Sequence, residues 1–508
     1  MSRISRLLTR ALPGVALNRA RARAKLEAIE QARKLMRYDA ATTGRRGASW
    51  HADRTNADSA AGFGRRARMA FVSRDLVRNV PLAARARDVI ASNVVGDGIV
   101  PKLVTDNAAL RNAALAVIEA HLDTVAIDAA GRNNLYGLQR MVMAALVTDG
   151  ECLVLRHQRS LADGLAIPLQ LEVLEADFLD DTRDGVLPDG GWVADGIQYA
   201  RNGTRVGYWL HSEHPGALSG YSAFTASAST FWRAEDVCHV YRADRPGQQR
   251  GVSWMAPVAL AIADLMDYRD AQIMKQRIAA CFAAFVEHTG DVEQAKKDLG
   301  LDSGIQPGAV QFLPDNTQIK FSTPPQSAEF ETFIRATQRE IAAGLGVTYE
   351  ALTGDLSGVN FSSARMGRME MDRNIAGWQW TLMIPQVLQP LDLWVRQAWV
   401  QALPGRVAAI MASRFDWVPP HRIIVDPARE IPALRDAVRA GFATRQGVQR
   451  QFGVDPERIL QEQIDDRKAA EKAGLVFDTD PSQVSATGVT NARPAGSEYP
   501  SEEEGENA

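Results

Sequence analysis

The chain has 508 residues, a hydrophobic content of 46% and a formal net charge of −3. That length exceeds what one hydrophobic core organises, so two or more packed regions are expected. The longest apolar runs, such as 279–286, fall well short of the about 20 residues of a membrane-spanning helix, and residues 1–10 lack the apolar region of a secretory signal. The composition therefore predicts a cytoplasmic protein without a membrane segment.

Cysteine usage excludes two classes of site. The three cysteines, Cys152, Cys238 and Cys281, stand far apart in the sequence. An odd number of isolated cysteines forms neither a disulfide framework nor a set of zinc ligands. We expect ordinary buried thiols.

The charge is distributed unevenly along the chain. Residues 1–90 carry 20 Lys and Arg against 7 Asp and Glu, whereas residues 455–508 carry 5 against 13. Blocks of this kind are often solvated arms. The first segment can equally meet an acidic partner or DNA phosphate through its arginines, and the sequence alone does not choose. These arginines are Arg3, Arg6, Arg10, Arg19, Arg21 and Arg23.

Three helices are predicted after a basic, loosely ordered arm at 1–66. The first runs from Met69 to Asn79, where Pro81 ends it and suits the first turn of the second helix. The second helix stops at Gly96, before a second glycine two residues later. The third is expected at 135–148.

Short strands are predicted next, from alternation and β-branched content, with glycine-containing turns between them. They lie at 152–157, 169–174, 198–199, 205–211 and 237–242. Together with the preceding helices they form an α+β domain at 67–254. The whole chain is predicted as an α+β, helix-rich protein.

A pair of long helices is predicted beyond this domain, at 255–285 and 326–346. In the first, Asp264, Asp267 and Asp270 recur every three residues, which keeps them near one face. A merely solvated face explains this spacing as well as a functional one does. Between the two helices, 286–325 reads as a small unit of strand, helix and strand.

The region 347–363 contains a polar loop between two helical patterns. One interpretation is a surface that contacts phosphate, with mobile glycines, and with Arg365 and Arg368 supplying the attraction. The other is that Asn360 or Ser363 only caps the following helix. The polar set is Thr353, Gly354, Asp355, Ser357, Gly358, Asn360, Ser362 and Ser363.

The region 364–427 is predicted to hold a long helix and the strand RFDWV. Pro385 and Pro390 interrupt the helix and should kink it. Two short helices are expected at 428–477, because Asp426 and Asp455 each precede a proline in the pattern of an N-cap. Residues 478–508 read as a disordered acidic tail. Four tryptophans are interpreted as core and helix-contact residues: Trp378, Trp380, Trp394 and Trp399.

Motifs for catalysis are mostly absent. The sequence has no Walker loop, HExxH or GxSxG motif, and the GxGxxA pattern that begins at Gly62 has no strand before it. His211 and His214 form an HxxH pair that lacks further metal-ligand spacing.

One acidic cluster is a candidate magnesium site for phosphodiester cleavage. No lysine occurs from Leu103 to Met274, which disfavours a nuclease that pairs acids with a lysine, so strand ends and turns are the favoured interpretation. The cluster consists of Asp149, Glu151, Glu172, Glu175, Asp177, Asp180 and Asp181.

Several long blocks of the sequence resemble the portal proteins of lambda-like tailed bacteriophages. The resemblance covers roughly residues 35–475. The blocks are RDLVRNVPLAARARDVIASNVVGDGI at 74–99, NGTRVGYWL at 202–210, CHVYRADRPGQQRGVSW at 238–254, and GVTYE, TGDLSG and NFSSAR within 346–365.

The resemblance implies the portal fold. It makes 67–254 a wing, 255–285 and 326–346 a stem, 286–325 a clip, 347–363 a tunnel loop region, 364–427 the kinked helix with a returning wing strand, and 428–477 a crown. It implies that the aspartates Asp264, Asp267 and Asp270 line a channel and that the loop at 353–363 projects into it. The clip residues assigned in this way are Asp291, Glu293, Lys296 and Lys297.

As function, the resemblance implies a ring of identical subunits, a dodecamer, at one vertex of a phage head. Double-stranded DNA passes through it without sequence recognition. The implied partners are the terminase large subunit, the major capsid protein and head-completion proteins, in a virion assembled in the host cytoplasm. No cofactor, no metal and no catalytic residue is expected. A metal-dependent nuclease built on the acidic cluster and a structural tail component stay open as alternatives.

Overall fold

The computed structural model describes residues 21–27, 54–62, 64–217, 229–281, 285–288, 317–320, 330–420, 427–452 and 456–475. The chain divides into two compact units, Met1–Ala60 and Ala61–Ala508. The described part of the first unit includes a helix at 21–27 and the beginning of α3 (Ala57–Ala61). Most of the predicted arm and all of the predicted acidic tail lie outside the described residues.

Helices α4 (Arg65–Asn79), α5 (Pro81–Val95) and α7 (Leu135–Thr148) confirm the three helices predicted for the start of the α+β domain. Pro81 occupies the first position of α5, and the Asn134 side chain caps α7 by accepting a hydrogen bond from the backbone N–H of Gly137. α5 and α7 pack together in the main core, where Ala86 and Ile90 of α5 are buried with Leu146 of α7.

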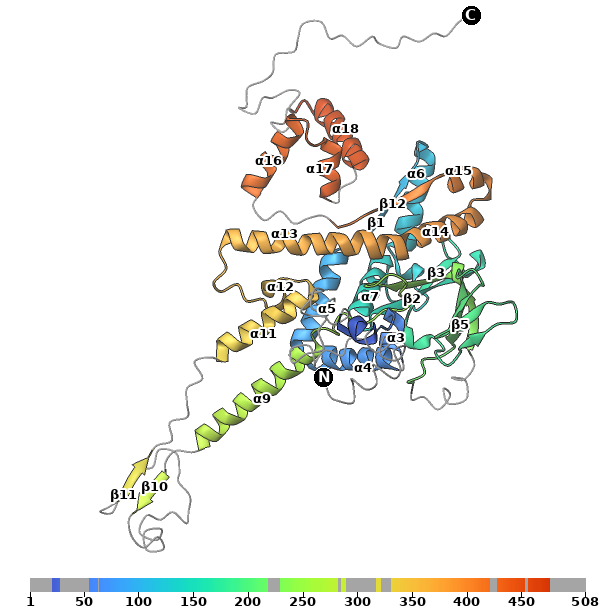
Figure 1. Ribbon diagram of the computed structural model, residues 1–508. Helices are drawn as coiled ribbons and strands as arrows, with labels where there is room; N and C mark the ends of the chain where they lie inside the picture. Colours follow the sequence, from blue (N-terminus) through green and yellow to red (C-terminus); the bar gives the residue numbers. More distant parts are fainter. Residues whose placement is uncertain are drawn as a thin grey trace, which may run out of the picture. The chain divides into compact units, whose positions relative to one another are not determined.

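Two antiparallel sheets follow (Figure 1). The first has β2 (Glu151–Gln158) between β3 (Leu169–Glu175) and β9 (Val237–Tyr241). The second consists of β4 (Gly185–Val186), β5 (Trp192–Ala194), β6 (Ile197–Tyr199), β7 (Arg205–His211) and β8 (Ser229–Arg233). Leu153 and Leu155 of β2 share a second core with Tyr208 and Leu210 of β7, which joins the sheets. All five predicted strands are confirmed.

Several elements were not predicted. β1 (Val100–Val104) pairs antiparallel with β12 (Arg414–Val418), although more than 300 residues separate them. Pro101 argues against a strand in the sequence, so β1 was not predicted. The proline is tolerated there because β1 has a neighbouring strand on one side only. Strands β4, β5 and β8 of the second sheet were not predicted either. Further unpredicted elements are the helix α6 (Ala108–Val117) and the short segments η2 (Ile118–Leu122), η3 (Val125–Ile127), η4 (Leu161–Asp163), η5 (Ala176–Phe178) and η6 (Ala234–Asp236).

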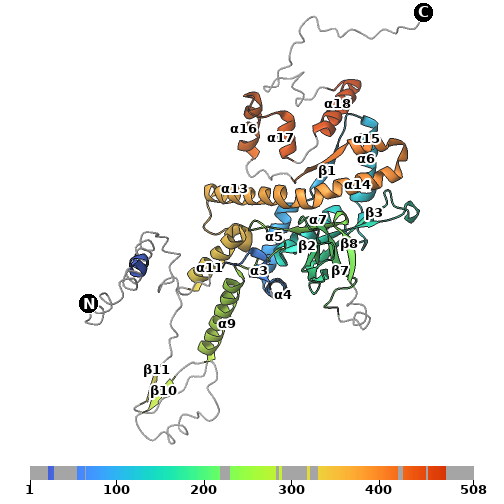
Figure 2. The same cartoon turned by 45° about the vertical axis from the view of Figure 1, so that its right-hand side comes forward.

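Helices α9 (Ala259–Cys281) and α11 (Phe330–Leu345) correspond to the predicted long pair (Figures 1 and 2). The Tyr268 ring of α9 lies against Phe330 and Phe333 of α11, with ring centroids 5.7 and 4.5 Å apart. Between these helices, β10 (Phe285–His288) and β11 (Thr317–Lys320) pair antiparallel. The helix expected within 286–325 lies outside the described residues.

The short helix α12 (Tyr349–Thr353) lies before the polar loop. After the loop, α13 (Phe361–Trp378), the π-helical segment η8 (Gln379–Leu388) and α14 (Gln389–Ala402) form one continuous helical run (Figure 1). The predicted interruption takes the form of η8, which contains Pro385, with Pro390 in the first turn of α14. A π-helical segment accommodates the missing N–H of a proline by rearranging the local bonds. η9 (Pro404–Arg406) and α15 (Val407–Ala412) lead to β12.

The four tryptophans do not all behave as predicted. Trp394 and Trp399 are buried in the main core, and Trp378 packs on Trp254 with ring centroids 5.1 Å apart. Trp380 is 61% exposed, so its assignment to the core is wrong. It lies on the side of the helix that faces away from the core.

The C-terminal region has three helices rather than the two predicted. They are α16 (Pro427–Arg439), α17 (Arg445–Gln451) and α18 (Pro456–Ala473). α16 and α18 begin at the prolines that the sequence marks, while the short α17 carries no such signal. Among the described residues, no helix combines the length and apolar content needed to cross a membrane.

Candidate functional site

The polar loop between α12 and α13 is shorter than predicted. α12 ends at Thr353, and Gly354 continues with a φ of 75°, a conformation that favours glycine. α13 begins at Phe361, so Ser362 and Ser363 belong to the helix and not to the loop. The Asn360 side chain caps α13 by accepting a hydrogen bond from the Ser363 N–H at 2.8 Å. The capping interpretation is therefore confirmed for Asn360.

Asp355 organises the loop. Its Oδ1 accepts hydrogen bonds from the Ser357 hydroxyl at 2.5 Å and the Ser357 N–H at 2.9 Å, and its Oδ2 accepts one from the Tyr349 hydroxyl at 2.9 Å. The bonds from Ser357, followed by the one from Tyr349, lower the pKa of Asp355 to about 2. The carboxylate that the sequence singles out is thus ionised and engaged by Ser357 of the loop and by Tyr349 of α12.

The arginines that follow the loop are on α13, and both have partners. Arg368 donates to Asp372 at 2.8 Å, one helical turn along the same helix. Arg365 lies 4.0 Å from Glu430 of α16. Both side chains remain exposed in part, at 49% for Arg365 and 42% for Arg368, so they can still face a polyanion.

The three aspartates predicted to line the channel are all exposed. Asp264, Asp267 and Asp270 lie on α9, and none of the three forms a hydrogen bond or an ion pair within the described part of the chain. Leu260 and Met274 are exposed on the same face. This face is therefore mixed, and not the purely polar one that the aspartate spacing indicates. The predicted clip residues, Asp291, Glu293, Lys296 and Lys297, lie outside the described residues.

Glu151 of the acidic cluster is a buried structural charge. It follows Gly150, whose φ of 93° and close approach to the backbone of Val252 leave no room for a Cβ. Arg250 donates to it at 2.7 Å, the Gly251 N–H at 2.8 Å, and the His239 Nε2 lies 2.9 Å away. Burial alone favours the neutral acid, but Arg250 and His239 outweigh it and hold the pKa of Glu151 well below its usual range.

Three other acids converge on one arginine that the sequence reasoning did not single out. Arg74 of α4 donates to both oxygens of Asp149 at 2.8 and 3.0 Å, and it lies 3.3 Å from Glu175 and 2.5 Å from Asp177. Burial raises the pKa of Asp149 to about 6, against the pull of Arg74. Arg74 stands 75 positions before Asp149, so only the fold brings them together.

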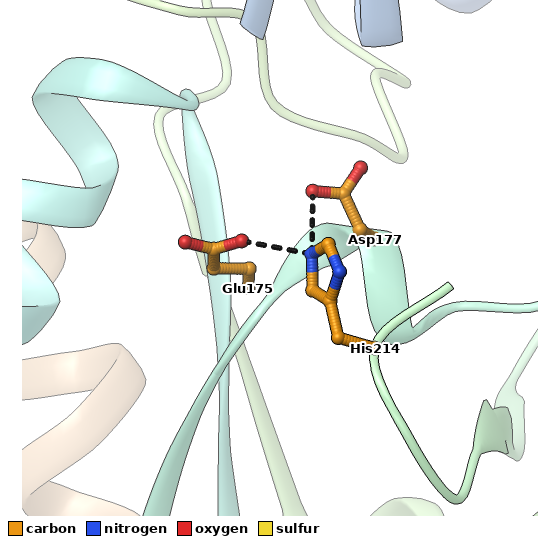
Figure 3. Close-up of side chains that lie close together, drawn as sticks. All are labelled: Glu175, Asp177 and His214. Atoms are coloured by element: carbon orange, nitrogen blue, oxygen red, sulfur yellow. Dashed lines mark hydrogen bonds and ion pairs between the residues drawn. The ribbon is translucent and has the colours of Figure 1, made fainter. Parts of the chain in front are cut away.

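His214 completes this group from the turn after β7. Its Nε2 is 3.1 Å from Glu175 Oε2 and 3.5 Å from Asp177 Oδ2 (Figure 3). The rest of the predicted cluster is dispersed: Glu172 pairs with His157 at 2.7 Å, Asp180 accepts from Thr182, Arg183 and Ser229, and Asp181 is exposed in a turn. His211 lies near Asp180, not beside His214.

The group around His214 has the side-chain types of a metal site, but a positively charged arginine already lies beside its carboxylates. Glu175, Asp177 and His214 place one ligand atom each within 4.8 Å of the others. However, the Arg74 guanidinium contacts the same two carboxylate oxygens, so it already holds the position of the cation. A metal ion there would be repelled by Arg74 at short range. We interpret the group as an ion-pair network that ties α4 to β3 and the turn after β7.

Comparison with known proteins supplies the context for these residues. The model of the family "Phage portal protein, lambda family" matches residues 43–379. A probable portal protein of Halomonas phage phiHAP-1 is 25% identical over 387 residues, which cover 72% of each chain. The portal proteins of Escherichia phages N15 and lambda are 24% and 23% identical, and each match covers 55% of this chain and 59% of the relative.

Solved structures of low sequence identity align with the chain. One is a chain of the virion of a native gene transfer agent particle, with 16% identity, a TM-score of 0.44, and coverage of 76% of this chain and 94% of that one. Another is a HK97 family phage portal protein from Corynebacterium diphtheriae, with 13% identity, a TM-score of 0.30, and coverage of 72% and 98%. Because both TM-scores are low, the assignment of the chain to a family depends on the sequence match over residues 43–379.

Proposed function

This chain belongs to the lambda family of phage portal proteins, and we propose that it acts as a closed ring that surrounds DNA at one vertex of a phage head. Membership of the family, shown by the match over residues 43–379, is the observation that carries the function. As a portal protein the chain is a component of the virion and takes part in DNA packaging and in the connection of head and tail.

The exposed apolar side chains of the long helices support a ring. Leu260 and Met274 on α9 and Met366 on α13 are each more than half exposed in the single chain. A closed ring buries such residues, because each subunit offers one surface to the neighbour on one side and a different surface to the neighbour on the other. We propose about twelve subunits, the number that the family resemblance implies.

The channel surface in this proposal comes from the loop at 354–360 and from one edge of the α9 face. Backbone N–H groups and hydroxyls can touch phosphate oxygens without reading sequence. An acidic edge repels phosphate and limits adhesion, so double-stranded DNA can move. Because Leu260 and Met274 share the α9 face with the aspartates, we assign only an edge of that face to the channel.

The partners of the ring are the terminase large subunit, the major capsid protein and the head-completion proteins. We assign terminase docking to the clip at 286–325, because this segment connects two long helices at one end and its replacement need not disturb either core.

We infer that the ring performs no chemistry of its own. Four of the seven acids in the predicted nuclease cluster are held by arginines of the subunit itself: Asp149, Glu175 and Asp177 by Arg74, and Glu151 by Arg250. Purified protein should neither cleave DNA nor hydrolyse ATP with Mg²⁺ or Mn²⁺ present. Metal-dependent cleavage that Asp177→Ala or Glu172→Ala abolishes would restore the nuclease as the better function.

A further inference from the structure

One side of α13 carries an exposed apolar stripe. Its members are spaced alternately by three and four residues, which aligns them along one side of a helix. Met366 is 73% exposed and Trp380, at the start of η8, is 61% exposed, whereas Met371 and Ile375 on the opposite side belong to the main core. The stripe consists of Met366, Met369, Ala376 and Trp380, with the charged Arg373 at its centre, and all five residues are exposed.

The exposed face of α9 has the same layout with the opposite charge. Leu260, Asp267 and Met274 follow one another at intervals of seven residues, and Leu260 and Met274 are 80% and 54% exposed. On α13, Met366, Arg373 and Trp380 also follow at intervals of seven. Each helix therefore presents an apolar residue, a charge and a second apolar residue over the same length.

The two central charged side chains have no partner among the residues that the structure describes. Asp267 and Arg373 are both exposed, and neither forms a hydrogen bond or an ion pair with any described residue. Since both faces are exposed, they do not cover each other within one chain. The neighbours of these helices in the chain lie on other sides: α9 packs on α11, and α13 packs on α5.

We propose that α9 of one subunit packs on α13 of the adjacent subunit, with Asp267 facing Arg373. This contact rests on the proposed ring and names the surfaces that close it. A ring needs two different, complementary surfaces on each subunit, and these two faces are complementary in both charge and apolar pattern. A seven-residue repeat on both helices allows their side chains to interdigitate.

The charge pair also fixes the register of the two helices. If one helix moves by two turns, which is seven residues, Asp267 and Arg373 are each placed against an apolar residue, and a charge that loses both water and partner is costly. The order apolar, charged, apolar reads the same from either end, so the match holds for parallel and antiparallel helices. Asp264 and Asp270 then lie at the two edges of the contact, where one edge is free to face the channel.

Charge reversal tests the contact. Asp267→Arg and Arg373→Asp are made singly and together, and ring formation is measured by light scattering and negative-stain imaging at one protein concentration. Two reversals elsewhere serve as matched controls: Asp106→Arg in the segment between β1 and α6, and Arg201→Asp in the turn between β6 and β7, both of which are exposed. A thermal melt of each variant shows that the subunit is folded.

Each single reversal should lose most of the rings, the double variant should recover them, and the controls should match the wild type. A second variant pair, Asp267→Cys with Arg373→Cys, should form a disulfide between subunits on mild oxidation, and neither cysteine alone should do so. Wild-type rings that tolerate both single reversals overturn the contact and leave the ring intact. A wild-type protein that stays monomeric overturns the proposed ring itself, and the contact with it.

Discussion

The α+β domain and the long helices differ in how their charged side chains are placed. In the α+β domain, Glu151 and Asp149 are buried and each is held by an arginine from a distant part of the sequence. On α9 and α13, Asp267 and Arg373 are exposed and have no partner in the described part of the chain. The difference separates charges that hold one subunit together from charges that are available to a second subunit or to DNA.

Glu151→Ala should have the largest effect on the subunit. It leaves Arg250 buried without its carboxylate, which typically costs about 3–5 kcal/mol of unfolding free energy. Urea unfolding measures this loss. The matched control is Glu172→Ala, whose partner His157 is only partly buried, and it should cost about 1 kcal/mol or less. Equal losses in the two variants would show that burial does not distinguish these pairs.

The Arg74 group should give a pH dependence of intermediate size. Burial raises the pKa of Asp149 to about 6, above the ordinary aspartate value of about 4. The folded state therefore holds this proton more tightly than the unfolded state, so the stabilisation is complete below about pH 4 and is lost as the pH rises through about 6.

Asp149→Asn should remove this dependence, which amounts to about 2 kcal/mol between pH 4 and pH 7. Unfolding measured across that range compares the variant with the wild type and with Asp181→Asn, which changes an exposed carboxylate. A wild-type protein that gains stability over this interval, relative to Asp149→Asn, would reverse the sign and contradict the account.

Shortening the loop should have the smallest effect on the subunit. Deletion of Leu356–Val359 removes the bonds between Ser357 and Asp355 but leaves the Asn360 cap and both helices. Exposed changes of this kind typically alter stability by about 0.5 kcal/mol, so rings should still form. The length or the retention of packaged DNA should change instead. A control that replaces the same four residues by Gly and Ser keeps the length of the loop. Rings that package and hold full-length DNA after the deletion would make the loop a mere connector.

Sequence patterns located the elements better than the contacts between them. The limits of α5 and α7 follow from Pro81, Gly96 and Asn134, which are local signals. β1 was missed because its pairing with β12 spans the chain. α17 was missed because it is short, although Thr444 caps it by accepting a hydrogen bond from the Gly447 N–H.

The same distinction applies to the candidate site: its local features were predicted from the sequence, and its long-range contacts were not. The loop was found from its composition, because glycine and small polar residues exclude regular structure, but its end was misplaced since Asn360, not Ser363, provides the cap. The Arg74 group was not predicted, because the arginine and the acids it holds are 75 or more positions apart. The exposure of Trp380 likewise depends on which side of the helix the core covers.

Negative-stain imaging of the purified protein tests the central claim most directly, supported by light scattering against the subunit mass of 55.5 kDa. The account predicts closed rings with a central hole and a mass about twelve times that of the subunit. Particles that remain single subunits at every concentration, with or without DNA and partner proteins, would contradict it.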